Sequence, residues 1–112
     1  MSFNKIGYFQ LDNILQARIP CMLIAYDNIE LGLWYNSIIK LHLEAITTHL
    51  LPEQDIHHLK LDGLPDSQSI VVIDKDGTKA QHLVSQLEEK GFTNVFYVTG
   101  GFEQLSKERS ES

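Results

Sequence analysis

Residues 70–80, IVVIDKDGTKA, decide the fold of this chain. The four apolar residues Ile70–Ile73 predict a strand that is buried on both faces, as strands of a parallel sheet are. The polar segment Asp74–Lys79 predicts a turn that leads into a helix, and Thr78 and Gln81 have the spacing of a capping box. A buried strand that enters a helix through a short polar loop indicates an α/β protein with a site at the carboxyl end of the strand.

The elements after this loop continue the same alternation. One apolar face, formed by Ala80, Leu83, Val84 and Leu87, predicts a helix that stops at Lys90-Gly91. A strand over 95–98, a turn over 99–101 and a helix over 102–108 follow. Strands that alternate with helices predict a single α/β domain with a mostly parallel central sheet and helices on both faces.

The first half is less regular. Leu11, Ile14 and Leu15 have helical spacing, and the unbroken apolar run 21–26 predicts a second buried strand. The remaining expectations are a helix over 29–35, a strand from the alternation of Ile39, Leu41 and Leu43, helix or loop over 43–51 and 53–61, and a turn over 62–66.

Composition and charge exclude several functions. The net charge of -6 argues against a nucleic-acid partner, which needs clustered Lys and Arg. No apolar run approaches the roughly 20 residues of a membrane helix, and the N-terminus lacks a signal-peptide core, so the cytoplasm is the expected compartment. The single cysteine, Cys21, allows no internal disulfide. We expect a domain over 1–106 and a polar C-terminal tail over 107–112.

The last third of the chain resembles a rhodanese-like (sulfurtransferase homology) domain. In that family a buried strand is followed by a Cys-x-x-Gly-x-Arg loop and a helix, then Gly-Phe, a second strand and Gly-Gly. Gly77, Gly91-Phe92, Asn94-Val95 and Gly100-Gly101-Phe102 match at the expected spacing. The resemblance implies a rhodanese-like fold.

The first half matches that family only in the order of its elements. The family's Asp-x-Arg falls near residues 25–27, which do not match, and its Gly-His-Ile falls near 36–38. Leu105 replaces a family tryptophan after the Gly-Gly pair.

The resemblance places Asp74 at the position of the catalytic cysteine. It implies chemistry by a thiolate that takes up sulfur as a persulfide, and a carboxylate cannot store sulfur in this way. Cys21 begins a different strand, at the opposite end from the expected site. We therefore expect no catalytic residue, metal or cofactor, and a binding loop made of Asp74, Lys75, Asp76, Gly77, Thr78 and Lys79.

The charges of this loop cancel, because Lys75 and Lys79 balance Asp74 and Asp76. If the loop keeps the family's shape, the Asp74 carboxylate accepts the N–H groups that otherwise hold an anion. The function expected is an inactive binding or regulatory module whose partner is another protein or domain, or a small anion.

Two other interpretations of the loop remain open. One is an enzyme, either an atypical sulfurtransferase or a Mg²⁺-dependent phosphatase. The phosphatase is considered because a strand followed by Asp-Lys-Asp-Gly-Thr also resembles haloacid dehalogenase-type phosphatases. That resemblance implies Asp74 as the nucleophile and Asp76 as the acid/base. The other is a purely structural turn, for which Asp and Gly are common residues.

Other candidate residues favour structural roles. His57 and His58 are adjacent and predict a solvated surface rather than a metal site, and His82 is expected to be exposed. His42 and His49 share a helix face only if residues 43–51 are helical. Trp34 and Tyr35 are expected to pack on the core.

Overall fold

The computed structural model describes residues 4–26, 29 and 31–111. Within that part of the chain the strands are β1 (Lys5–Ile6), β2 (Met22–Tyr26), β3 (Thr47–Leu50), β4 (Ile70–Ile73) and β5 (Val95–Val98). The α-helices are α1 (Tyr8–Gln16), α2 (Ser37–Ile46), α3 (Thr78–Glu89) and α4 (Gly101–Glu111). Two short 3-10 turns, η1 (Gly32–Trp34) and η2 (Ile56–His58), lie in the connections.

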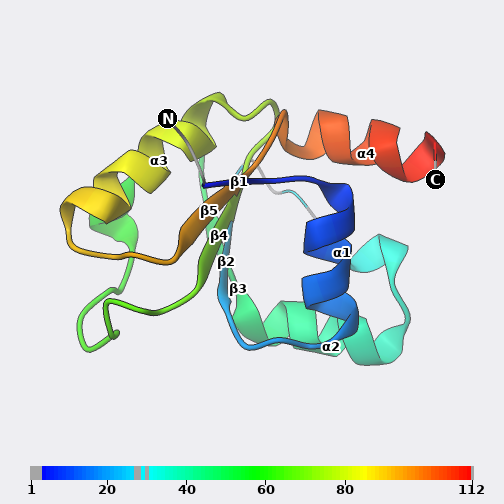
Figure 1. Cartoon of the computed structure of the whole chain (residues 1–112), viewed down its shortest axis with the longest axis horizontal. Coiled ribbons are helices and arrows are strands. Elements are labelled where there is room, and N and C mark those ends of the chain that lie inside the picture. The colour runs from blue at the N-terminus through cyan, green and yellow to red at the C-terminus, as the bar shows by residue number, and fades with distance from the viewer. Residues whose placement is uncertain (1–3, 27–28, 30, 112) are drawn as a thin grey trace.

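The five strands form one sheet in the order β1-β5-β4-β2-β3, and every neighbouring pair is parallel (Figure 1). The strand β4 lies between β5 and β2, with Ile70 opposite Val95 on one side and Met22 on the other. Because all strands run in one direction, their carboxyl ends meet at one edge of the sheet, where Asp74 follows β4. The predicted α/β fold class is confirmed.

Helices cover both faces of the sheet. The helix α3 lies on one side, and α1, α2 and α4 lie on the other (Figure 1). The four residues of β4 alternate between the two cores: Ile70 and Val72 pack with Leu83 and Leu87 of α3, whereas Val71 and Ile73 pack with the other three helices. All four β4 residues are buried, as the unbroken apolar run predicts.

The elements predicted from apolar runs and one-sided helices are confirmed. The strands β4 and β5 have the predicted bounds, and β2 begins at Met22 rather than Cys21. The last helix runs three residues further than predicted, so residues 107–111 of the expected polar tail are helical. Contacts with the domain hold this end in place, because the Arg109 guanidinium lies 5.0 Å from the centre of the Trp34 ring.

The strand predicted from Ile39, Leu41 and Leu43 is wrong, since these residues belong to α2. Ile39 and Leu43 are buried one turn apart, while Leu41 is 66 % exposed. An exposed leucine between two buried positions therefore produced a false alternation. The Asn36 side chain begins this helix by accepting the Ile39 N–H at 3.1 Å. The strand β3 follows at once, where helix or loop was expected.

Two further parts of the first half differ from the expectation. Of the helix predicted over 29–35, the described residues form only the single turn η1. Residue 30 of that helix lies outside the described residues. So does Asp27, which belongs to the segment compared with the family's Asp-x-Arg. The two-residue strand β1 was missed. Two hydrogen bonds join it to the sheet. The Tyr97 N–H donates to the Asn4 carbonyl at 2.7 Å, and the Thr99 N–H donates to the Ile6 carbonyl at 2.9 Å.

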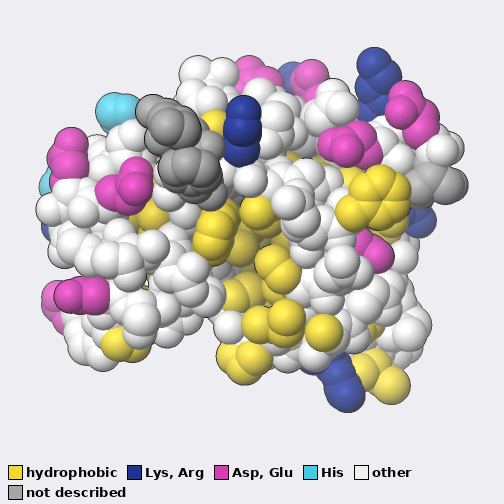
Figure 2. All heavy atoms as spheres, viewed as in Figure 1, with side chains coloured by type: hydrophobic (Ala, Val, Ile, Leu, Met, Phe, Trp, Pro, Cys, Tyr) yellow, Lys and Arg dark blue, Asp and Glu magenta, His cyan; other side chains and the backbone are white. Residues whose placement is uncertain are grey.

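Apolar side chains gather on the surface in the lower middle of the view, around α1 and α2 (Figure 2). The most exposed large apolar residue in the described part is Leu33 of η1, at 83 %; Ile38 and Leu41 of α2 follow it along the chain. In the described ranges, no helix has both the length and the apolar character needed to span a bilayer.

Candidate functional site

The loop that follows β4 is held by the carboxylate of Asp74. Its Oδ1 accepts the Gly77 N–H at 2.6 Å, and its Oδ2 accepts the Lys79 and Ala80 N–H groups at 2.8 and 3.2 Å. The side chain is 1 % exposed, and it is the one buried polar side chain in the described part of the protein. The first amides of α3 are thus satisfied internally, and a negative charge lies at the positive end of the helix dipole.

Asp76 caps the same helix from the solvent side. Its Oδ1 accepts the Thr78 N–H at 3.0 Å, and this bond lowers the pKa of Asp76, with a smaller contribution from the Thr78 side chain. The capping box predicted from Thr78 and Gln81 is wrong. Gly77, which has no side chain, occupies the cap position, and the two carboxylates accept the amide hydrogens that a threonine would take. Gln81 instead donates to the Tyr97 hydroxyl at 2.9 Å.

The Gly100-Gly101 turn packs directly against the loop. The Phe102 N–H donates to the Asp74 carbonyl at 2.7 Å, and the Glu103 N–H donates to the Lys75 carbonyl at 3.1 Å. A Cβ at Gly101 would lie 2.5 Å from backbone atoms of residues 74, 75 and 76, and its φ is +66°. The sequence indicated only a turn here. A glycine pair before a helix was the available signal for this close approach.

The two lysines of the loop differ in their surroundings. Lys75 is exposed. Lys79 is half-buried, and its Nζ lies 5.7 Å from the centre of the Tyr26 ring at the carboxyl end of β2. All six predicted loop residues therefore lie together at the sheet edge, but the anion that the loop amides bind belongs to the chain itself.

This geometry does not favour Asp74 as a phosphatase nucleophile. Both of its oxygens accept backbone N–H groups, and the side chain is closed off from solvent. A nucleophilic carboxylate needs an oxygen that the substrate can reach, and burial denies that access. No group of three or more His, Cys, Asp or Glu side chains suited to a metal lies within the described residues.

Cys21 lies at the opposite end of the sheet from this loop. It precedes Met22, which pairs with Ile70 at the start of β4, so it is about 16 Å from Asp74 along the strands. Its side chain is half-buried, and burial raises the pKa of the thiol. Cys21 does not reach the loop.

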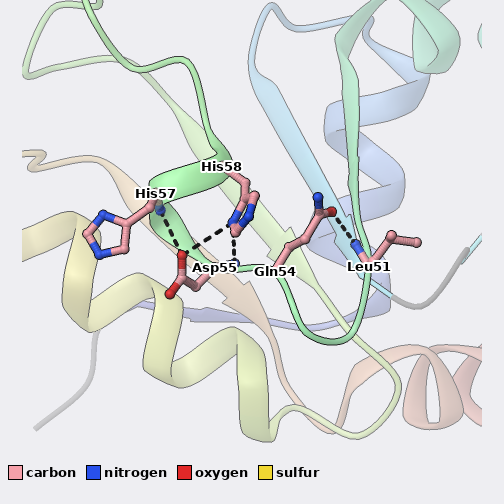
Figure 3. Close-up of polar contacts among 5 residues, drawn as sticks. All are labelled: Leu51, Gln54, Asp55, His57 and His58. Atoms are coloured by element: carbon pink, nitrogen blue, oxygen red, sulfur yellow. Dashed lines mark hydrogen bonds and ion pairs between the residues drawn. The ribbon is translucent and has the colours of Figure 1, made fainter.

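The paired histidines belong to a local turn (Figure 3). The Asp55 carboxylate accepts the His57 N–H at 2.9 Å, which is the main cause of the lowered pKa of Asp55. The Asp55 N–H donates to His58 Nδ1 at 3.2 Å, and Gln54 accepts the Leu51 N–H at 2.8 Å. Both histidines are exposed, as predicted, and they lie in η2, the 3-10 turn that Asp55 caps.

The remaining candidates are also structural. His42 lies in α2 and His49 in β3, so they share no helix face, and His82 is exposed as expected. Trp34 is half-buried and stacks on Phe102 with ring centres 5.2 Å apart.

Tyr35, beside it in the sequence, donates its hydroxyl to Asp12 at 2.9 Å. Burial, followed by that bond, raises the pKa of Tyr35.

Comparison with known proteins supports the fold. The model of a family described as "Rhodanese-like domain" matches residues 38–108. A similar solved structure is that of SseA from Escherichia coli, a 3-mercaptopyruvate sulfotransferase, with a TM-score of 0.57 and 14 % sequence identity. The likeness covers 96 % of this chain and 50 % of that one, so this chain spans about half the length of that protein. No match to a curated protein sequence was found.

Proposed function

The chain belongs to the rhodanese-like family, and we propose that it is a member without sulfurtransferase activity that acts as a binding or regulatory module. The single observation that carries this proposal is the Asp74 carboxylate, which accepts three amide hydrogens of the loop. The resemblance places the reactive cysteine of the family at this position. A carboxylate is a hard oxygen anion, and it forms no reversible persulfide.

The filled loop also explains why an external anion is not expected at this site in the native protein. Loop amides and a helix N-terminus bind anions well, but only when their N–H groups are free. Here Gly77, Lys79 and Ala80 already donate to Asp74 at 2.6 to 3.2 Å. Asp74 thus accounts both for the proposed absence of sulfurtransferase activity and for the proposed absence of an external anion at the loop amides.

The partner proposed is another protein or domain that contacts the outer side of the loop. Lys75, Asp76 and Thr78 are exposed there, and together they present both signs of charge. A loop that presents both signs of charge suits recognition of a complementary polar surface. The net charge of -6 and the absence of a basic run disfavour nucleic acid, and the cytoplasm is the proposed compartment.

A thiosulfate-to-cyanide transfer assay tests the proposal. The native protein is expected to show no turnover, and Asp74→Cys is expected to form a persulfide or to gain measurable transfer. Asp76→Cys is the matched control, because it places a thiol in the same loop, away from the three amides that Asp74 binds. Turnover by the native protein would overturn the proposal. Mg²⁺-dependent phosphate release is expected to be absent as well, which tests the phosphatase alternative.

A further inference from the structure

A concave site away from the Asp74 loop lies on the face of the sheet that α1, α2 and α4 cover. We call it the edge pocket: a cavity of about 160 Å³ that lies between the last two strands of the sheet, β2 and β3, and α2, with Ile29, Leu31 and Gly32 also in its lining. Its apolar walls come from Leu23, Ala25, Leu31 and Leu43. These residues belong to the core that contains α1, α2 and α4, whereas Ala80 of α3, whose N–H donates to Asp74, belongs to the core under α3. The edge pocket is therefore separate from the Asp74 loop.

The volume sets the size of a ligand. A dry cavity of about 150 Å³ in a protein core accepts a benzene molecule. The edge pocket thus has room for an apolar group of about six heavy atoms, such as a phenyl ring or a branched aliphatic chain. Its exposed lining residues, Lys40, Glu44 and His49, show that it reaches the surface. The apolar part of a ligand would lie inside, with any polar part at this mouth.

Two opposite charges stand at the mouth. Lys40 and Glu44 lie one turn apart on α2, and no ion pair joins either of them to another residue of the described part. The order Lys before Glu at this spacing is the less favourable one for an ion pair within a helix. Both charges are thus available to a ligand.

The position of the lysine depends on a glycine. A Cβ at Gly32 would lie 3.1 Å from Lys40 Cγ and 3.6 Å from its Cε, so the lysine side chain runs along the backbone at this residue. This contact places the lysine stem across the segment that borders the pocket. Because this contact restrains the lysine stem, a ligand that meets the ammonium group orders the side chain at a smaller cost in side-chain entropy than for a free surface lysine.

From these features we propose that the edge pocket binds a small zwitterion with an apolar side chain, that is, a free apolar α-amino acid or a close analogue. The apolar group fills the cavity, the ligand carboxylate meets Lys40, and the ligand ammonium meets Glu44. A purely anionic ligand would be repelled by the net charge of -6 and would leave Glu44 beside it unpaired. A ligand that carries both charges avoids both penalties.

The test is calorimetric titration of the full chain with L-leucine and L-phenylalanine. Two analogues are the matched controls: 3-methylbutylamine lacks the carboxylate, and 4-methylpentanoate lacks the ammonium. Binding of an amino acid at millimolar concentration or below is expected, with each analogue weaker by about tenfold, the effect of losing one charge-assisted bond. No binding of either amino acid, or equal binding of an analogue, would overturn the proposal.

Variants locate the site. Lys40→Ala and Glu44→Ala are each expected to weaken binding by about tenfold, and Lys60→Ala, exposed and outside the pocket, is expected to leave it unchanged. Ala25→Leu fills the cavity and is expected to abolish binding. Unchanged affinity in both Lys40→Ala and Glu44→Ala would contradict the proposal. Since these two positions are on the surface, the test does not depend on whether Ala25→Leu folds.

Discussion

The Asp74 loop lies at the carboxyl end of β4, and the edge pocket lies on the face of the sheet that α1, α2 and α4 cover. The two regions differ in what fills them. At the loop, a carboxylate of the chain accepts three amide hydrogens, so these N–H groups are not available to a ligand. At the edge pocket, the walls are apolar, about 160 Å³ stays open, and two charges at the mouth have no ion-pair partner among the described residues. The comparison teaches that the site expected from the family's fold need not be the one left open to a ligand.

The largest effect is expected where the loop backbone meets α4. In Gly101→Ala the new Cβ would lie 2.5 Å from three backbone atoms of the loop at a φ of +66°, and we expect the free energy of unfolding to fall by about 3 kcal/mol or more. Gly63→Ala is the matched control, because its φ of +85° is also strained but nothing lies within 4 Å of the new Cβ. It should cost only about 1 kcal/mol.

Urea unfolding of both variants measures these costs. Equal losses in the two would show that backbone strain alone matters, and that the close approach of Gly101 to the loop does not.

The carboxylate itself should have the next largest effect. Asp74→Ala leaves three amides at the start of α3 without their acceptor, and we expect a loss of about 2–4 kcal/mol, less than the sum of three charge-assisted bonds because the buried charge also costs free energy. Asp74→Asn keeps one acceptor oxygen and should lose less. Chemical unfolding provides the measurement, and an unchanged stability of Asp74→Ala would contradict the structural role of the carboxylate.

One substitution made in both regions sharpens the comparison. Ala25→Val adds two methyl groups at the wall of the edge pocket, in a strand, and should raise the unfolding free energy by about 0.5–1 kcal/mol. Ala80→Val makes the same change in α3 at a position with 0 % exposure, and should lower it by about 1–3 kcal/mol. A loss at Ala25 as large as that at Ala80 would show that the pocket has no room.

The smallest effect expected is one of pH. Folding lowers the pKa of Asp76 below its ordinary value of 3.8, mainly through the Thr78 N–H. A lowered pKa stabilises the fold above the unfolded-state value, and this contribution is lost as the pH falls through the folded-state value. The stability advantage of the native protein over Asp76→Asn should therefore shrink below about pH 4. A difference that stays constant between pH 5 and pH 3 in thermal unfolding would refute this role.

The sequence was most informative where burial is complete. The run Ile70–Ile73 predicted a buried strand, which the structure confirms. That Asp74 accepts loop amides was expected from the resemblance, on the condition that the loop keeps the family's shape. Near the edge of the sheet the pattern failed. The helix α2 exposes Ile38 and Leu41, so its apolar residues follow no single face, and the edge pocket around it was not foreseen.

Contacts between distant segments were also beyond the sequence. The bonds from Phe102 and Glu103 to the carbonyls of residues 74 and 75 depend on how α4 meets β4 in space. The Gly-Gly pair indicated a turn, but local spacing cannot tell a turn from a close approach of two backbones. The helical end at residues 107–111 also depends on a contact between distant segments, because the Arg109 guanidinium packs on the ring of Trp34 in η1.

Titration of sulfate into the native protein and into Asp74→Ala, followed through the amide NMR signals of Gly77, Lys79 and Ala80, tests most directly that Asp74 occupies the anion position of the loop. Asp76→Ala is the control, since it removes an exposed carboxylate from the same loop. The account predicts that sulfate shifts these three signals in Asp74→Ala alone. Equal shifts in the native protein, or none in a folded Asp74→Ala, would contradict it.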